Sequence, residues 1–364
     1  MNLNERVFVI AEAGVNHNGD LARAIALIDA AVDAKADAVK FQTFRADALV
    51  TAAAPKAAYQ IRQTGNDETQ HAMLRKLELD HAAHSALAEH CNKRGIAFLS
   101  TPFDAESLRF LAEDMGLTSI KVGSGDLTNA PMLLDIARRG LKVILSTGMS
   151  TMDDIAEALG VLAFGYTAQV GQAANAAAFA EALAGHPAAL KDKVVLLHCT
   201  TDYPTDPGAV NLRAMQTMAE RFALPVGYSD HTDSLAVTLA AVALGACVIE
   251  KHFTMDRNLP GPDHKASLEP RELSELVAGI RTVERARGDG DKVPQVAELG
   301  NRDVARKSIV ATRDIAKGAP MTADDLSVKR PGTGIPPIRL WDLIGKRADR
   351  SYAKDEQIDP CLLT

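Results

Sequence analysis

Short apolar runs alternate with longer stretches of helical periodicity up to about residue 287. Each run is apolar at successive positions, which is the pattern of a parallel strand covered by helices on both faces. The runs predict strands at residues 7–11, 38–42, 96–100, 119–122, 142–146, 193–198, 225–228 and 247–251.

The stretch after each run has apolar residues at the spacing of an amphipathic helix. Helices are expected at residues 20–34, 80–94, 104–114, 130–139, 151–162, 208–221, 234–244 and 270–287. Residues suited to cap their starts or stop them are Asp20, Asp80, Asp104, Gly95, Gly140 and Gly245. Eight unbroken strand–helix alternations favour a closed (β/α)8 TIM barrel, and an open doubly wound sheet is the alternative.

Two stretches exceed a minimal barrel. The alanine-rich residues 166–184 predict an additional helix before the sixth strand. Residues 45–79 form a long connection, which we expect to be an active-site loop because such loops in compact domains are usually functional or disordered.

The pattern changes after residue 287. Residues 288–306 are polar and rich in turn formers, and they predict a linker. Residues 307–364 combine short strands with Gly and Pro turns, which indicates a small β-rich domain near the lower size limit for independent stability. The expected organisation is a barrel at 1–287, a linker, and a domain that docks on its own barrel or on a partner.

Composition narrows the class of protein. The 364 residues carry a net charge of −7, which argues against a nucleic-acid surface. The four cysteines show neither metal nor disulfide spacing, which fits a reducing compartment. The first residues contain no basic segment followed by a long apolar run, so we expect a cytoplasmic protein without a membrane span.

Nearly every predicted strand ends in polar chemistry, and in a barrel these ends surround the active site. A charged residue on a parallel strand is costly to bury unless it is paired. The candidates at or after the strand ends are Glu12, Lys40, Gln42, Thr101, Lys121, Ser124, Ser146, Tyr203, Ser229, His231, Glu250 and His252. Internal ion pairs of Lys40 and Lys121 with Glu12 and Glu250 are the purely structural alternative.

Two histidines stand at the ends of adjacent strands. Glu250 and His252 are two residues apart and therefore face the same side of their strand. Imidazoles with nearby carboxylates suit a first-row divalent metal, so His231 and His252 are the predicted ligands. His17 and His198 compete for this role, but His17 could orient a glycine turn and His198 could be a core histidine.

Lysine and serine side chains predict an anion site. Lys40 and Lys121 supply point charges, and Ser124, Ser146 and Ser229 supply hydroxyl donors. Glycines beside Ser124 and at Gly148 let backbone N–H groups approach phosphate oxygens.

The ordered motifs of the chain resemble those of bacterial sialic acid synthases, and the last one resembles their C-terminal antifreeze-like (SAF) domain. These motifs are EAGVNHNGD at 12–20, KFQTF at 40–44, STPFD at 100–104, IKVGSGD at 120–126, LSTGMS at 145–150, YSDHT at 228–232, IEKHFT at 249–254, PGPDHKASLEP at 260–270 and VKRPGTGI at 328–335.

The resemblance implies condensation of phosphoenolpyruvate with an N-acylated mannose-type aldehyde, which yields a nonulosonate and phosphate. It implies that His231 and His252 hold a manganese-type cation, with magnesium and cobalt as alternatives, and that Glu250 supports the metal. Lys121, Ser124, Ser146 and Ser229 would bind the donor's phosphate, with Lys40 and Thr101 nearby. The residues that would face the sugar or handle protons are Glu12, Gln42, Tyr203 and Asp263.

The resemblance also implies a domain-swapped homodimer in which Arg330 reaches the partner's active site and contacts the N-acyl group. One position departs from many neuraminate synthases, which have Asn where this chain has Thr201 in TTDYP. This feature resembles the legionaminate-type branch more closely and leaves the acceptor open between N-acetylneuraminate and N,N'-diacetyllegionaminate synthesis.

Two other functions remain open from the sequence. A Schiff-base pyruvate aldolase would use Lys121 or Lys251 as its nucleophile, although Lys251 alternates away from His252 toward the helix layer. A non-enzymatic carbohydrate-binding or ice-binding protein would leave the polar strand ends unexplained, and the charges of Lys329, Arg330, Asp324 and Asp325 argue against an ice-binding face.

Overall fold

The computed structural model describes residues 6–65, 67–169 and 171–363. The chain divides into two compact units, Met1–Gly288 and Asp289–Thr364. Each unit has its own hydrophobic core, and each is described by itself below.

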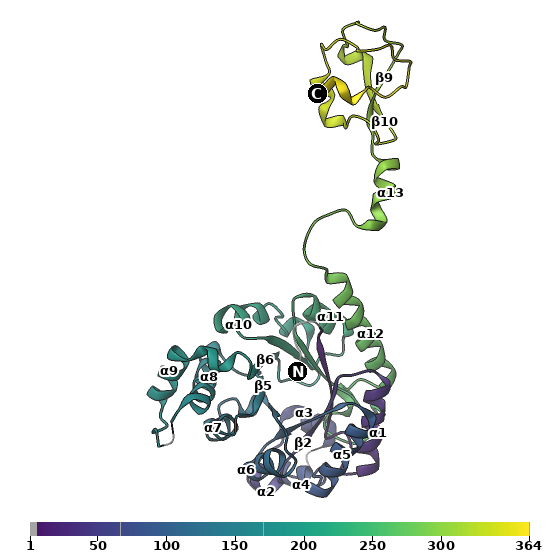
Figure 1. Ribbon diagram of the computed structural model, residues 1–364. Helices are drawn as coiled ribbons and strands as arrows, with labels where there is room; N and C mark the ends of the chain where they lie inside the picture. The colour runs from purple at the N-terminus through teal and green to yellow at the C-terminus, as the bar shows by residue number, and fades with distance from the viewer. Residues whose placement is uncertain (1–5, 66, 170, 364) are drawn as a thin grey trace. The chain divides into compact units, whose positions relative to one another are not determined.

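The first unit is a parallel eight-stranded barrel (Figure 1). Its strands are β1 (Phe8–Gly14), β2 (Ala38–Thr43), β3 (Ala97–Pro102), β4 (Ser119–Val122), β5 (Lys142–Ser146), β6 (Val194–Cys199), β7 (Val226–Asp230) and β8 (Val248–His252). The hydrogen-bonded order is β3-β2-β1-β8-β7-β6-β5-β4, and β3 packs beside β4 to close the circle. Every predicted apolar run overlaps one of these strands, and the predicted barrel is confirmed.

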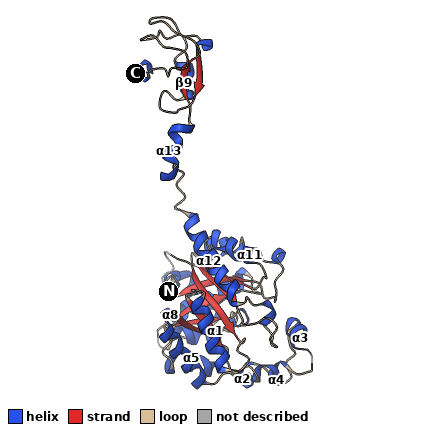
Figure 2. Ribbon diagram, turned by 90° about the vertical axis from the view of Figure 1, so that its right-hand side faces the viewer, coloured by secondary structure: helices blue, strands red, loops and turns tan. Residues whose placement is uncertain are grey.

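Helices surround the strands (Figure 2). They are α1 (Leu21–Asp33), α5 (His81–Arg94), α6 (Ala105–Arg109) with a π-helical continuation (Phe110–Asp114), α7 (Ala130–Arg138), α8 (Met152–Thr167), α10 (Ala214–Phe222), α11 (Leu235–Ala243) and α12 (Pro270–Arg287). Asp20, Asp80 and Asp104 each accept hydrogen bonds from backbone N–H groups of the first helical turn, as the sequence predicts for N-caps. The helix expected at 208–221 begins later, because Pro207–Ala209 forms a separate 3-10 turn.

The long connection at 45–79 contains three short helices, α2 (Ala46–Leu49), α3 (Ala58–Thr64) and α4 (Gln70–Arg75). A small apolar cluster of Val15, Phe44, Met73 and Leu77 holds this connection against the barrel. The connection is therefore a packed structure and not an irregular loop.

The alanine-rich insertion is a helix only from Ala176, as α9 (Ala176–Gly185). Its first residues instead extend α8 to Thr167. The other 3-10 turns of the barrel unit are Ser124–Asp126, Pro187–Leu190 and His264–Ala266.

The second unit pairs two short antiparallel strands, β9 (Ser308–Ala311) and β10 (Leu326–Lys329). They share a small core with Met321, Leu343 and Tyr352. Further 3-10 turns are Ala323–Asp325, Pro337–Asp342 and Pro360–Leu363. Helix α13 (Val296–Ala305) lies within the segment that we expected to be a turn-rich linker. In the described parts of the chain, no helix has the length and apolar character needed to cross a membrane.

Candidate active site

The alternation of side chains along the strands builds the site. Ile10, Ala38 and Val248 belong to an apolar cluster separate from the one beneath the helices, and they form a layer inside the barrel. Two residues further along the same strands, the side chains point the same way but are polar. Glu12, Lys40 and Glu250 therefore lie buried above the apolar layer, toward the carboxyl ends of the strands.

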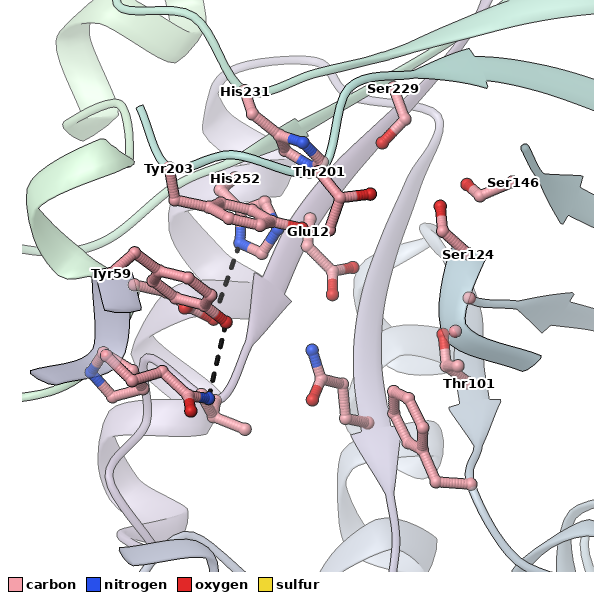
Figure 3. Close-up of a pocket in the computed structure, with 18 of the residues that line it drawn as sticks. Glu12, Tyr59, Thr101, Ser124, Ser146, Thr201, Tyr203, Ser229, His231 and His252 are labelled. Atoms are coloured by element: carbon pink, nitrogen blue, oxygen red, sulfur yellow. Dashed lines mark hydrogen bonds and ion pairs between the residues drawn. The ribbon is translucent and has the colours of Figure 1, made fainter. Parts of the chain in front are cut away.

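A cavity of about 410 Å³ lies at this end of the barrel. It is lined by every site residue predicted in the barrel: Glu12, Lys40, Gln42, Thr101, Lys121, Ser124, Ser146, Tyr203, Ser229, His231, Glu250, His252 and Asp263. Figure 3 shows Thr101 and the serines on one side of the cavity and the histidines and tyrosines on the other, with Thr201 between them. Arg330 lies in the second unit, where its Nε donates to the carbonyl of Ala305.

Two lysines and two glutamates form a buried ionic network in the cavity. Lys40 Nζ lies 2.6 Å from Glu12 Oε2 and 3.7 Å from Glu250 Oε2, and Lys121 Nζ lies 3.3 Å from Glu250 Oε1. Ser229 Oγ donates to Glu250 Oε1 at 2.9 Å. These are the ion pairs that the structural alternative predicted, but they line an open cavity and not a filled core.

The carboxyl groups of Glu12, Glu250 and Asp263 have different environments. Burial raises the pKa of Glu12 to about 7, although Lys40 opposes this rise. Burial also acts to raise the pKa of Glu250, but Lys121 and Lys40 outweigh it and lower the pKa to about 2. Burial raises the pKa of Asp263 to about 6. Near neutral pH, Glu12 and Asp263 can each gain or lose a proton, whereas Glu250 stays ionised.

Unpaired hydroxyls mark the side of the cavity next to Lys121. Ser146 Oγ and Thr201 Oγ1 are buried without a hydrogen-bond partner among the described residues. Ser124 Oγ accepts from the backbone N–H of Gly148 at 3.0 Å. A Cβ at Gly148 would lie 2.3 Å from Thr201 Oγ1, so only glycine leaves these hydroxyls room. Buried donors without partners are costly unless a ligand accepts from them, and an anion beside Lys121 would do so.

The histidines of β7 and β8 face each other across 5.5 Å between ring centroids. His231 Nδ1 lies 2.7 Å from the carbonyl of Thr200, which assigns the proton to Nδ1 and leaves Nε2 as a free electron-pair donor. His252 Nδ1 lies 4.0 Å from Asp263 Oδ2. Two imidazoles, one oriented by a carbonyl, with a carboxylate nearby fit the ligand set of a divalent metal.

The competing histidines lie outside the cavity lining. His17 Nδ1 accepts from the backbone N–H of Gly19 at 3.0 Å, and burial lowers the pKa of His17 to about 3. His198 Nε2 donates to the carbonyl of Val210 at 2.6 Å. His17 therefore holds the glycine turn, as its structural interpretation predicted. His198 has a hydrogen-bond partner, but it is half-buried and not a residue of the core.

The connection at 45–79 contributes apolar side chains to the cavity. The sequence predicted a loop here but none of its cavity-lining residues. These apolar side chains are Leu49, Val50, Met73, Leu74 and Leu77, and we call them the apolar wall. On the same side, the ring of Tyr59 packs 4.8 Å from the ring of Tyr203 (Figure 3). The length of the connection was the only signal, because apolar residues in a loop usually indicate packing alone.

Comparison with known proteins gives two family matches. Residues 27–292 match the model of the NeuB family, and residues 306–361 match the SAF domain. The chain is 48% identical to the N,N'-diacetyllegionaminic acid synthase of Campylobacter jejuni, over 97% of this chain and 99% of that protein. It is 46% identical to the enzyme of the same name from Legionella pneumophila, over 93% and 90%. It is 34% identical to human N-acetylneuraminate-9-phosphate synthase, over 96% and 91%.

Solved structures agree with the fold. An N-acetylneuraminic acid synthetase from Leptospira borgpetersenii, crystallised with citrate, superimposes with a TM-score of 0.66 at 33% identity and covers 82% of this chain and 90% of that one. A spore coat polysaccharide biosynthesis protein E from Chromobacterium violaceum superimposes with a TM-score of 0.72 over 98% and 99%, and its 23% identity supports the fold alone.

Proposed function

The chain belongs to the NeuB family, and we propose from this membership that it condenses phosphoenolpyruvate with an N-acylated mannose-type aldehyde, giving N,N'-diacetyllegionaminate and phosphate. It is an enzyme, and its relatives are named as synthases. The observation that carries the proposal is one cavity that combines a lysine–glutamate network, unpaired hydroxyls and two facing imidazoles.

The donor occupies the side of the cavity next to Lys121 in this proposal. Ser124, Ser146 and Ser229 lie on this side. The hydroxyls of Ser124 and Ser146 donate to the phosphate, and the Ser229 hydroxyl does so when it turns away from Glu250, to which it donates in this structure. Lys40 and Lys121 neutralise the donor's negative charge without forming a covalent bond. Glu250 keeps both lysines in place, since its carboxylate contacts both of them and Ser229.

His231 and His252 would hold a divalent cation, which we propose to be manganese, with magnesium and cobalt as alternatives. When bound, such an ion polarises the carbonyl of the acceptor aldehyde. Removing metal with a chelator and adding back single ions tests this assignment. Full activity of the metal-free protein would remove both histidines as ligands.

The reaction forms a bond between C3 of the donor and the aldehyde carbon of the acceptor. Water adds to C2 of the donor, and phosphate leaves as the C2–O bond breaks. Glu12 takes the proton from this water. Because its pKa is raised to about 7, a large fraction of Glu12 is ionised at neutral pH and can accept a proton. Asp263, whose pKa is also raised, donates a proton to the acceptor oxygen, which becomes a hydroxyl as the new carbon–carbon bond forms.

The apolar wall supports the choice of acceptor. Leu49, Val50 and Leu74 are half-buried and line the cavity, so they can cover methyl groups of a bound sugar. The sugar 2,4-diacetamido-2,4,6-trideoxymannose carries a second acetyl group and a C6 methyl, whereas N-acetylmannosamine has hydroxyls at these positions. Burial of the extra methyl groups favours the former sugar.

A phosphate-release assay tests both the reaction and the acceptor. The purified chain is incubated with phosphoenolpyruvate, manganese and either of these two sugars. We expect release with both acceptors and a higher kcat/KM with the diacetamido sugar. Absence of release with either sugar would contradict the synthase function, and a preference for N-acetylmannosamine would contradict the legionaminate assignment.

One observation favours the aldolase alternative: burial lowers the pKa of Lys121, as a Schiff-base lysine requires. Lys251 is not a candidate, because it lies outside the cavity lining and pairs with Asp230. Borohydride reduction in the presence of pyruvate separates the two functions. A covalent adduct at Lys121 supports the aldolase, and its absence together with phosphate release supports the synthase.

We propose further that the enzyme is a homodimer in which Arg330 completes the active site of the second subunit. The support is the match of residues 306–361 to the SAF domain and the position of Arg330 in its KRPG motif. A cytoplasmic location stays a prediction from sequence.

A further inference from the structure

A second buried ion pair lies behind the proposed metal site. Lys251 Nζ lies 3.1 Å from Asp230 Oδ2, and both side chains have 0% exposure. The two residues are register partners on β8 and β7. Neither lines the cavity, so their charges face the helix layer and not the substrates.

Asp230 is the centre of a fully satisfied network. Its Oδ1 accepts from the backbone N–H of Thr232 at 2.8 Å and from the Tyr228 hydroxyl at 3.2 Å. Its Oδ2 accepts from the hydroxyl of Thr238 on α11. Lys251 Nζ also donates to the carbonyl of Thr232. Both backbone polar groups of Thr232 are thus engaged by this one ion pair.

The network encloses the backbone that carries the two imidazoles. His231 stands between Asp230 and Thr232, and His252 follows Lys251 directly. Successive side chains of a strand point to opposite faces, so the ion pair holds the outer face while both histidines point inward. The cross-link joins β7 to β8 at the level of both histidines.

Stability alone does not account for such a pair. Well-packed apolar residues in place of a buried ion pair are often neutral or stabilising. Groups that hydrogen-bond to metal-binding histidines typically change metal affinity when they are replaced. Lys251 and Asp230 lie one step further out, because they hold the backbone on either side of His231 and do not contact the imidazoles.

We propose that Lys251 and Asp230 are positioning residues that fix the distance between His231 and His252 for cation binding. The proposal rests on the proposed metal site. In this proposal the two residues do not contact the substrate. They control the affinity of the protein for the free cation.

Titration of the metal-free, full-length protein with Mn²⁺, followed by electron paramagnetic resonance, tests the proposal. Asp230→Asn and Lys251→Met should each raise the Kd for Mn²⁺ by about 10- to 100-fold. Thr238→Val removes only one hydroxyl from the network and keeps the side-chain shape, so it should raise the Kd by a smaller factor. Thr238→Val tests the proposal if Asp230→Asn and Lys251→Met do not fold.

The matched control is Asp37→Asn at the opposite end of the barrel. Asp37 Oδ2 lies 2.7 Å from Arg281 Nη2 and accepts from the N–H of Val9 at 2.8 Å. This variant should lower the Tm but leave the Kd for Mn²⁺ unchanged.

An unchanged Kd in Asp230→Asn and Thr238→Val would overturn the positioning role, as would an equal rise in Asp37→Asn. If the wild-type protein itself binds no Mn²⁺, the proposed metal site fails, and the inference falls with it. The two failures are therefore distinguishable.

Discussion

Different charged neighbours give two equally buried carboxyl groups of the cavity different properties. Glu12 and Glu250 both contact Lys40, but only Glu250 also contacts Lys121 and Ser229. The extra contacts keep Glu250 ionised, whereas burial dominates at Glu12 and raises its pKa. A pair of carboxyl groups separated in this way can divide the work of charge stabilisation and proton transfer.

Replacing Glu12 tests its proposed role as the base. We expect Glu12→Gln to lower kcat by about 10²- to 10⁴-fold, the usual contribution of a general base, with little change in the KM for phosphoenolpyruvate. Steady-state phosphate release measures both constants. Glu106→Gln, on the exposed surface of α6, is the matched control and should behave like the wild type. Turnover of Glu12→Gln near the wild-type rate would remove Glu12 from the chemistry.

Leu74 tests the apolar wall. Leu74→Gln places an amide where we expect sugar methyl groups to pack. Loss of one such contact should lower kcat/KM for the diacetamido sugar by about 10-fold, at about 1.5 kcal/mol for a buried apolar side chain. The KM for phosphoenolpyruvate and the rate with N-acetylmannosamine should change less.

The control for this variant is Leu244→Gln, because Leu244 is 41% exposed and distant from the cavity lining. An equal loss for both acceptors would mean that the apolar wall supports the fold and does not select the sugar.

Among the elements, β7 is closely packed at Gly227. Gly227 lies between β6 and β8, and a Cβ there would lie 2.4 Å from the carbonyl oxygen of Val248 and 2.7 Å from Leu197 Cδ2. Its backbone conformation is open to any residue, so only space requires glycine. The close approach brings Ser229 on β7, and His231 directly after this strand, next to Glu250 and His252 on β8.

Gly227→Ala should therefore destabilise the barrel. Because a backbone carbonyl cannot move aside easily, we expect a loss of about 1–3 kcal/mol or more in the free energy of unfolding. Urea unfolding followed by circular dichroism measures this loss. The matched control is Gly300→Ala in α13, where no described heavy atom lies within 4 Å and a gain of about 0.5–1 kcal/mol is expected. A Gly227→Ala protein as stable as the wild type would show that β7 and β8 can separate.

The chain as a whole consists of two units, each with its own hydrophobic core. The barrel contains every predicted site residue except Arg330, which lies in the second unit. Mixing two inactive variants, Glu12→Gln and Arg330→Ala, tests whether Arg330 acts on a second subunit. In a mixed dimer, the site with an intact Glu12 would receive the intact arginine of its partner.

With random pairing of equal amounts, we expect recovery of about a quarter of the wild-type activity in the mixture. Phosphate release after co-expression or subunit exchange measures the recovery. Activity no higher than that of the separate variants would show that Arg330 acts within its own chain or not at all.

The pattern of the chain sufficed to predict the barrel and many of the polar side chains that line its cavity. Parallel strands buried on both faces are apolar at every position, so the exceptions at Lys40, Lys121 and Glu250 were visible without coordinates. The carboxyl ends of all barrel strands share one face, so these residues were expected to meet. The segment of α13 was misjudged because Gly300 and its polar neighbours resemble a linker.

Other features depend on contacts between segments far apart in the chain, and no local pattern reports them. The apolar wall exists because residues 49–50 and 73–77 contribute side chains to the lining of the cavity. The different pKa values of Glu12 and Glu250 follow from which lysines reach each carboxylate. Lys251 read alone could have been a nucleophile. Its pairing with Asp230 across two strands keeps its charge out of the cavity, because the free energy of a buried charge depends on the partner that the fold brings to it.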